Sequence, residues 1–245
     1  MNKNNFILVL LLSFIFLSCD SENDSYVFRA SPNFYFQPNF LDTVEYKGEV
    51  NKNGIAEGKW KINLRKSKME VDLQPDALSN LDYVIPSRYE LKEKTPNGFV
   101  WYTYNDESIM IFLDTIKSLN LKGGGIILNE ISGISQLCPE DTSCTPIDYQ
   151  GNLIRYEDDY FSGVYYFREK KDAQFYNKLG YIGYVENQLI LFVYQFPENK
   201  DLQLNQSLFT LLTENILVNK KNLIPPMVKY KSMKPMNFSA ALKNI

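Results

Sequence analysis

The sequence contains no histidine among its 245 residues. That absence excludes the Ser-His-Asp triad, the Cys-His catalytic pair and metal centres that depend on imidazole ligands. Two motifs of serine hydrolases are also missing, because neither Ser-x-x-Lys nor Gly-x-Ser-x-Gly occurs. We therefore predict no catalytic residue and no cofactor, and we favour a binding protein over an enzyme.

An excess of one charge sign and long apolar runs are also lacking. The 26 Lys and Arg residues nearly balance the 29 Asp and Glu residues, which argues against a nucleic-acid partner. The apolar run from Phe6 to Leu17 would cover about 18 Å as a helix, short of the roughly 30 Å core of a bilayer. With Lys3 before it and the small Ser18 after it, the run has the layout of a signal peptide.

The residues Phe16-Leu17-Ser18-Cys19 resemble the lipobox of bacterial lipoproteins, with Phe16 at the position where leucine is usual. The resemblance implies cleavage before Cys19 and attachment of a diacylglyceryl group and an N-acyl chain, such as palmitate, to that residue. Two or more chains anchor a protein stably. Some lipoprotein systems read an aspartate after the cysteine, here Asp20, as inner-membrane retention, and others read an acidic run there as a surface-export signal; we favour the outer membrane, on the periplasmic or cell-surface face. An ordinary secretory peptide with a chance cysteine is the alternative.

Cysteine is scarce, with three residues in the chain, and two of them lie close together in a loop rich in proline and acids. In an exported protein, Cys138 and Cys144 most simply form a disulfide. So short a ring stabilises the fold by about 2–2.5 kcal/mol and could hold a contact loop in shape. Two thiolates without a second pair of ligands do not predict a zinc site, so we predict no metal.

Strict alternation of apolar and charged residues predicts strands at 44–50 and 58–65 that form a hairpin. Residues that pair across a hairpin share a face of the sheet. Because the large apolar residues of both segments have even numbers, the two numbers of each pair must have an even sum. This parity favours Tyr46 opposite Ile62 and Gly48 opposite Trp60, with the Trp60 ring covering the bare glycine. Residues 69–73 alternate in the same way and predict a third strand. The polar residues 75–82 predict a connector and a domain boundary.

Beyond that connector, the pattern predicts strands at 89–94, 99–104, 108–113, 161–168, 175–185 and 189–196. Residues 108–113 are apolar on both faces, which predicts a central strand covered on both sides, with a short helix at 114–121 as one cover. Apolar spacing over 205–218 predicts an amphipathic helix with Asn205 as its N-cap. This order of strands and a helix loosely resembles PsbP/Mog1-like proteins.

We therefore predict the α+β class: a mostly antiparallel sheet with the carboxy-terminal helix packed on it. The predicted organisation is a signal peptide at 1–18, an acidic tether at 19–30, a hairpin or meander region at 31–80, an α+β domain at 81–219 and a lysine-rich tail at 220–245.

Four further features of the sequence bear on function. The acidic run 157–159 would serve a glycosidase through Glu157 or Asp159, but we favour a solvated loop, with a calcium cluster as a further alternative. Gly123-Gly124-Gly125 lacks the end of a phosphate-binding loop and predicts a turn or bulge. The aromatic residues of 156–196 predict mostly core, with a sugar-stacking platform as the lesser alternative. The tail predicts a solvated end or contacts with an anionic partner such as lipid phosphate, through Lys220, Lys221, Lys229, Lys231 and Lys234.

Together these features predict a membrane-anchored envelope lipoprotein that binds or scaffolds an envelope protein or glycan. A carboxylate-dependent enzyme acting on polysaccharide is the alternative from another class. A periplasmic immunity protein that blocks a toxin is a third reading.

Overall fold

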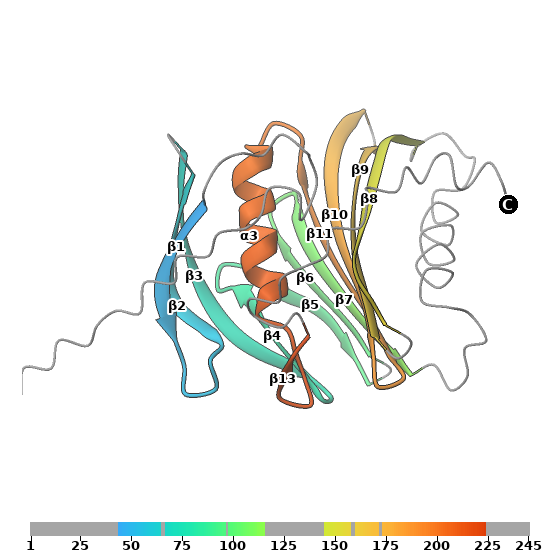
Figure 1. The fold of residues 1–245 in the computed structure, drawn as a ribbon. Coiled ribbons are helices and arrows are strands. Elements are labelled where there is room, and N and C mark those ends of the chain that lie inside the picture. The colour runs from blue at the N-terminus through green and yellow to red at the C-terminus, as the bar shows by residue number, and fades with distance from the viewer. Residues whose placement is uncertain are drawn as a thin grey trace, which may run out of the picture.

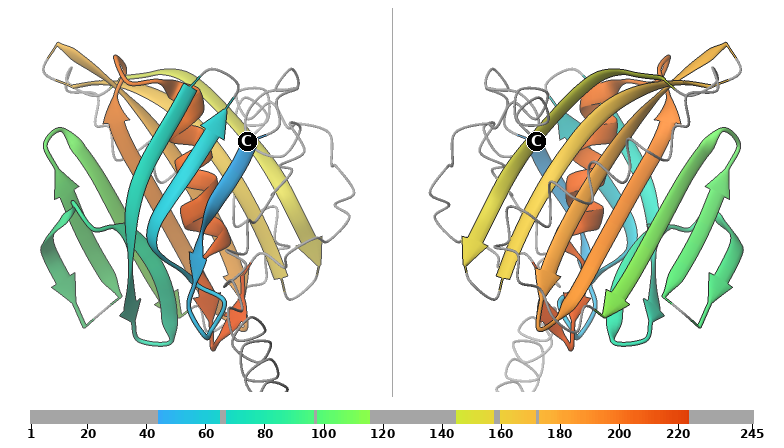
Figure 2. Two further views of the ribbon diagram at one scale, coloured as in Figure 1. Left: turned by 90° about the vertical axis from the view of Figure 1, so that its left-hand side faces the viewer. Right: turned by 90° about the vertical axis from the view of Figure 1, so that its right-hand side faces the viewer.

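The computed structural model describes residues 44–64, 67–96, 98–115, 145–157, 160–171 and 173–223. These residues form two antiparallel sheets with one helix between them (Figures 1 and 2). The six-stranded sheet has the order β1 (Val44–Val50), β2 (Ala56–Leu64), β3 (Ser67–Leu78), β4 (Leu81–Pro86), β12 (Leu217–Val218) and β13 (Lys221–Asn222). The seven-stranded sheet has the order β5 (Glu90–Thr95), β6 (Phe99–Tyr104), β7 (Glu107–Thr115), β11 (Gln188–Pro197), β10 (Gln174–Val185), β9 (Tyr160–Lys171) and β8 (Thr145–Glu157).

The helix α3 (Leu202–Glu214) lies in the interior and contacts strands of both sheets. Its apolar side chains Leu208, Phe209 and Leu212 are fully buried. Hydroxyl groups are buried on it as well, and each donates to a carbonyl one turn earlier, as Ser207 does to Gln203 at 2.8 Å and Thr213 does to Phe209 at 3.0 Å. These local bonds allow a helix with polar residues to be covered on two sides.

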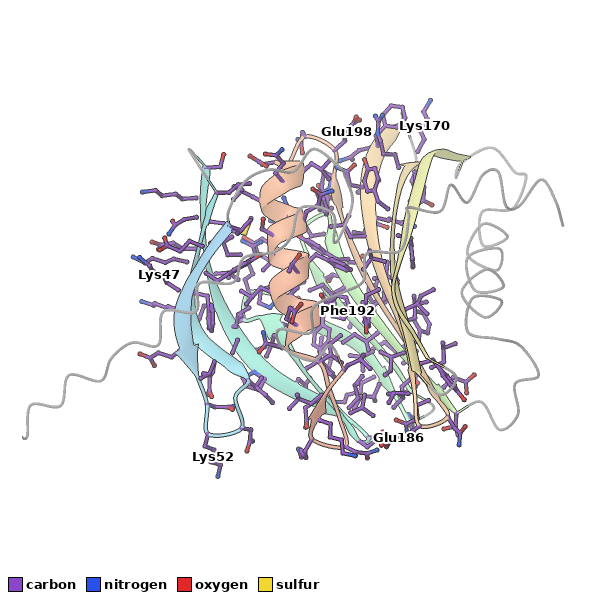
Figure 3. The ribbon with its side chains drawn as sticks, viewed as in Figure 1. Lys47, Lys52, Lys170, Glu186, Phe192 and Glu198 are labelled. Carbon is purple, nitrogen blue, oxygen red and sulfur yellow. The ribbon has the colours of Figure 1, made fainter. Side chains whose placement is uncertain are left out.

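The interior between the layers holds the core of the protein. Phe192 of β11 is fully buried, and Figure 3 shows its side chain between the seven-stranded sheet and α3, whereas Lys47 and Lys52 project from the opposite layer into solvent. Direct hydrogen bonds also join the layers. The Tyr83 and Tyr102 hydroxyls lie 3.0 Å apart across the two sheets, and the Tyr46 hydroxyl donates to the carbonyl of Ser207 at 3.0 Å.

The predicted α+β class is wrong. The described residues form a mostly β fold with a single helix of 13 residues, and this helix does not lie on one sheet as predicted. The strands that include residues 44–86 form a second sheet, which covers the other side of the helix. Amphipathic spacing identified the helix correctly, but burial on both sides depends on a sheet that the spacing alone does not reveal.

The predicted hairpin is confirmed, because Tyr46 pairs with Ile62 across β1 and β2. The register shifts between Lys47 and Glu49, so Gly48 and Trp60, predicted to lie opposite each other, fall in a β-bulge and not in the regular ladder. A Cβ atom on Gly48 would lie 2.2 Å from the Trp60 ring, so the indole covers this glycine as predicted. The strands predicted around residues 69–73, 89–94, 99–104, 108–113, 161–168, 175–185 and 189–196 are also present.

Two local predictions are wrong. Residues 75–82 are not a connector, because they complete β3 and begin β4, with Pro75 opposite Val84. The pairing of β3 with β2 ends at Leu73, so Pro75 lies where no ladder bond is needed on that side. The helix begins after Asp201, whose carboxylate accepts the Leu204 N–H at 3.0 Å, and not after Asn205.

The strand predicted at 108–113 is central, since β7 lies between β6 and β11. Its inward side chains Ile109 and Ile111 are fully buried, but Phe112 on the opposite face is 40% exposed. The prediction that both faces are covered is therefore wrong for this strand. The helix predicted at 114–121 falls outside the described residues beyond Thr115, and residues 114 and 115 continue β7.

Candidate functional site

Aromatic side chains form a continuous strip on the outer face of β6 and β7, the face turned away from α3. The register places Phe99 opposite Phe112 and Trp101 opposite Met110, so all four side chains share this face. The right-hand view of Figure 2 shows these green strands toward the right-hand edge of the seven-stranded sheet. We call the four residues the aromatic strip.

Two side chains of the aromatic strip are accessible to solvent, although large apolar side chains of a strand are ordinarily covered. Trp101 is 38% exposed and Phe112 is 40% exposed, and these two are among the few large apolar residues of the described chain with such exposure. The Phe99 and Phe112 rings lie 4.7 Å apart at an interplanar angle of 37°. Because these apolar side chains gather on one sheet face, we take the strip as the first candidate contact surface among the described residues.

The strip is bordered by hydroxyl groups and acids. Thr95 of β5 lies opposite Phe99, and Glu93 lies opposite Trp101. Asp114 is exposed at the end of β7 and lies on the same face as Phe112. The register also places Glu90 of β5 on this face, opposite Thr103, and the Lys92 ammonium pairs with it at 2.8 Å, so Glu93 and Asp114 are the acids that stand next to the rings. The strip can offer ring faces in its middle and hydrogen-bond acceptors at its borders.

A second candidate is Glu107, a carboxylate that is 4% exposed in the interior. It accepts a very short hydrogen bond from the Tyr89 hydroxyl, and the Arg88 guanidinium lies 3.3 Å from the same oxygen, Oε2. The Lys200 ammonium lies 3.5 Å from Oε1. The Tyr194 hydroxyl lies 3.2 Å from Oε2 and donates to Asn205 Oδ1 at 2.6 Å.

These contacts bring together the two segments that cross between the sheets. Arg88 and Tyr89 lie where the chain passes from β4 to β5, and Lys200 lies where it passes from β11 to α3. Burial, together with the Glu107 charge, raises the pKa of Tyr89 well above its usual range, so its hydroxyl stays a donor. Donors inside the protein surround the carboxylate, so we assign Glu107 to holding the layers together and not to chemistry on a ligand.

A third polar cluster centres on Asp76 of β3. Tyr102 donates a very short hydrogen bond to it, and Lys94 lies 3.1 Å away. Burial acts to raise the pKa of Asp76, but the bonds from Tyr102, the Ala77 N–H and Lys94 outweigh burial, and the pKa lies below its usual range. This cluster also joins the two sheets, because Tyr102 belongs to β6.

Most residues singled out from the sequence lie outside the described part of the chain. These are the lipidation residue Cys19, the disulfide residues Cys138 and Cys144, the glycines 123–125, the acids Asp158 and Asp159, and the tail residues Lys229, Lys231 and Lys234. Glu157 ends β8. Their roles stay predictions.

Lys220 and Lys221 lie in the described chain, in the turn and strand after β12. The Lys220 ammonium pairs with Asp82 at 2.8 Å, and that of Lys221 pairs with Glu186 at 3.4 Å. Figure 3 shows Glu186 at the end of the molecule opposite Glu198 and Lys170. Both lysines are used within the fold, although their side chains remain largely exposed.

Among the side chains of 156–196 that the structure describes, most aromatic ones belong to the core, as predicted. Tyr165 is 1% exposed and Tyr166 is 7% exposed, and the Tyr166 hydroxyl donates to Asn177 at 2.9 Å. The aromatic surface is found instead on β6 and β7, which sequence reasoning did not single out. A signal was present, because residues 108–113 are apolar on both faces, but it was interpreted as a strand covered on both sides, with a helix at 114–121 as one cover.

Two kinds of site are absent from the described residues. They contain no group of three or more Cys, Asp or Glu side chains arranged to hold a metal ion. None of their helices is long and apolar enough to cross a membrane.

Comparison with known proteins places the chain in no family. No family model matches it, and no curated protein matches its sequence. Among solved structures, it is similar to the cyanobacterial PsbP protein CyanoP of Synechocystis sp. PCC 6803, with 17% identity and a TM-score of 0.45 over 60% of this chain and 92% of that one. It is also similar to the Saccharomyces cerevisiae Ran-binding protein Mog1p, with 12% identity and a TM-score of 0.41 over 61% of this chain and 96% of that one.

PsbP and Mog1, which the order of strands and helix loosely resembles, are thus among the structural neighbours of the chain, and at these TM-scores no function follows from the likeness.

Proposed function

We propose that this protein is a lipid-anchored component of a bacterial cell envelope that binds another envelope component without transforming it. The anchor rests on the lipobox-like residues 16–19 and the polar stretch that follows Cys19. An outer-membrane position, on the periplasmic or cell-surface side, is part of the same proposal.

The observation that carries the binding role is the exposed aromatic strip. An anchored protein is confined near its partners, so a modest contact surface is enough for stable association because the local concentration is high. The strip lies on regular strands of a sheet whose inner face is fixed by the core, which makes it a rigid platform.

The chemistry of the acids supports binding over catalysis. Glu107, the buried carboxylate among the described residues of β7, is surrounded by donors from the protein itself. A general acid or base must lie within hydrogen-bond reach of the ligand atom that gains or loses the proton. We therefore place the function on the outer surface and not on this carboxylate.

The anchor is tested by metabolic labelling of cells with an alkyne analogue of palmitate. The expected result is label on the wild-type protein and none on the Cys19→Ser variant. A Cys138→Ser variant serves as the matched control and retains the label. An unlabelled wild-type protein that accumulates in the culture medium would contradict the proposal.

A further inference from the structure

We infer that the aromatic strip is a stacking platform for an uncharged stretch of an envelope polysaccharide. This inference rests on the proposed binding function and adds to it the site and the chemical class of the partner. Sugar rings present C–H faces that pack on aromatic rings, and their hydroxyls at the ring edges require hydrogen-bond partners.

The strip offers its rings in an arrangement suited to an extended chain. Trp101 and Phe112 lie on adjacent strands at diagonal positions of one face, and the Phe99 ring contacts that of Phe112. Neighbouring side chains on a sheet face are about 5–8 Å apart, which is the scale of one sugar unit. The strip is therefore wide enough to contact two or more consecutive sugars of a chain, and not only one sugar ring.

The charges around the strip favour a neutral polyol. Glu93 and Asp114 border the rings on this face, and both are acids that accept hydrogen bonds from hydroxyl groups. The same acids would repel the phosphates of an anionic lipid surface, which attracts basic clusters. They would also face one another in a symmetric dimer formed through this surface, because the same patch meets itself in such an interface.

The two tryptophans of the chain make the inference directly testable. Trp60 belongs to β2, packs on Gly48 of β1 and is 3% exposed, whereas Trp101 of the strip is 38% exposed. Acrylamide in solution therefore quenches the fluorescence of Trp101 and leaves that of Trp60 largely unaffected. A ligand that covers the strip lowers the quenching of the whole protein toward that of Trp60 alone.

The experiment uses the full-length protein anchored in phosphatidylcholine vesicles, titrated with cellohexaose, with the hexamer of N-acetylglucosamine and with fragments of peptidoglycan. At least one of these glycans is expected to protect Trp101 from acrylamide. The Phe112→Ala variant is expected to bind it about tenfold more weakly or worse, because it removes a central stacking ring. Leu91→Ala is the matched control: Leu91 is 51% exposed but lies opposite Tyr102, off this face, and its loss leaves binding unchanged.

Three outcomes would overturn the inference. They are protection by none of the glycans, protection that depends on protein concentration alone, and protection only when anionic phosphatidylglycerol replaces phosphatidylcholine. The second would indicate self-association, and the third would indicate a lipid surface. Failure here with normal palmitate labelling of Cys19 would remove the glycan assignment and leave the anchor part of the proposed function intact.

Discussion

Replacing Glu107 by alanine should destabilise the protein markedly, because this carboxylate holds together the two crossings between the sheets. The buried Tyr89 hydroxyl would lose its acceptor, which costs about 1–3 kcal/mol. The contacts with Arg88 and Lys200 contribute less, about 1 kcal/mol together, because those side chains are 39% and 50% exposed. Tyr194 retains Asn205 as its acceptor. The expected loss in the free energy of unfolding is therefore about 2–4 kcal/mol.

Urea unfolding at neutral pH, followed by circular dichroism, measures this loss. Glu107→Gln keeps an acceptor for Tyr89 and should lose only about 1 kcal/mol, since a bond to a neutral group is weaker than one to a charged group. Glu93→Ala is the control, because that carboxylate is exposed, and its effect should stay within about 0.5 kcal/mol.

A double-mutant cycle with Tyr89→Phe separates the hydrogen bond from the other effects of the substitution. The coupling energy between Glu107 and Tyr89 should be about 1–2 kcal/mol. A loss below about 1 kcal/mol for Glu107→Ala, or a coupling energy near zero, would refute the assignment of Glu107 as a link between the layers.

Two further predictions concern the packing of the sheets. Gly180→Ala should lower the free energy of unfolding in urea by about 1–3 kcal/mol, because its Cβ atom would lie 1.8 Å from the buried Tyr165 ring. Gly183→Ala is the control and should lower it less, because the nearest atoms to its Cβ atom lie at 3.0 Å. A larger loss for Gly183→Ala than for Gly180→Ala would contradict the packing. The depressed pKa of Asp76 contributes stability above the ordinary carboxyl pKa of about 3.9 that is lost as the pH falls through the lower pKa of the folded state. The stability advantage of the wild type over Asp76→Asn, measured by thermal unfolding across pH, should therefore be present at neutral pH and narrow in acid, and a gap independent of pH would count against this role.

The sequence by itself determined the local structure of the hairpins. Alternation identified the strands, and parity favoured the pairing of Tyr46 with Ile62 and the cover of Gly48 by Trp60, both of which the structure shows. These features could be predicted because side chains on a strand alternate with a period of two, so the pattern itself states which residues share a face. Apolar spacing likewise identified the one helix, within a turn of its first residue.

Only the tertiary structure decided the layers and the candidate site. Residues 108–113 are apolar on both faces, and a pattern of this kind does not state which face a neighbouring layer covers. Contacts distant in sequence made that choice: Glu107 meets Tyr89 across 18 positions and Tyr194 across 87. The helix lies between two sheets because residues 44–86 and 217–222 form a layer of their own, which covers one face of β7 and leaves Phe112 on the other face exposed.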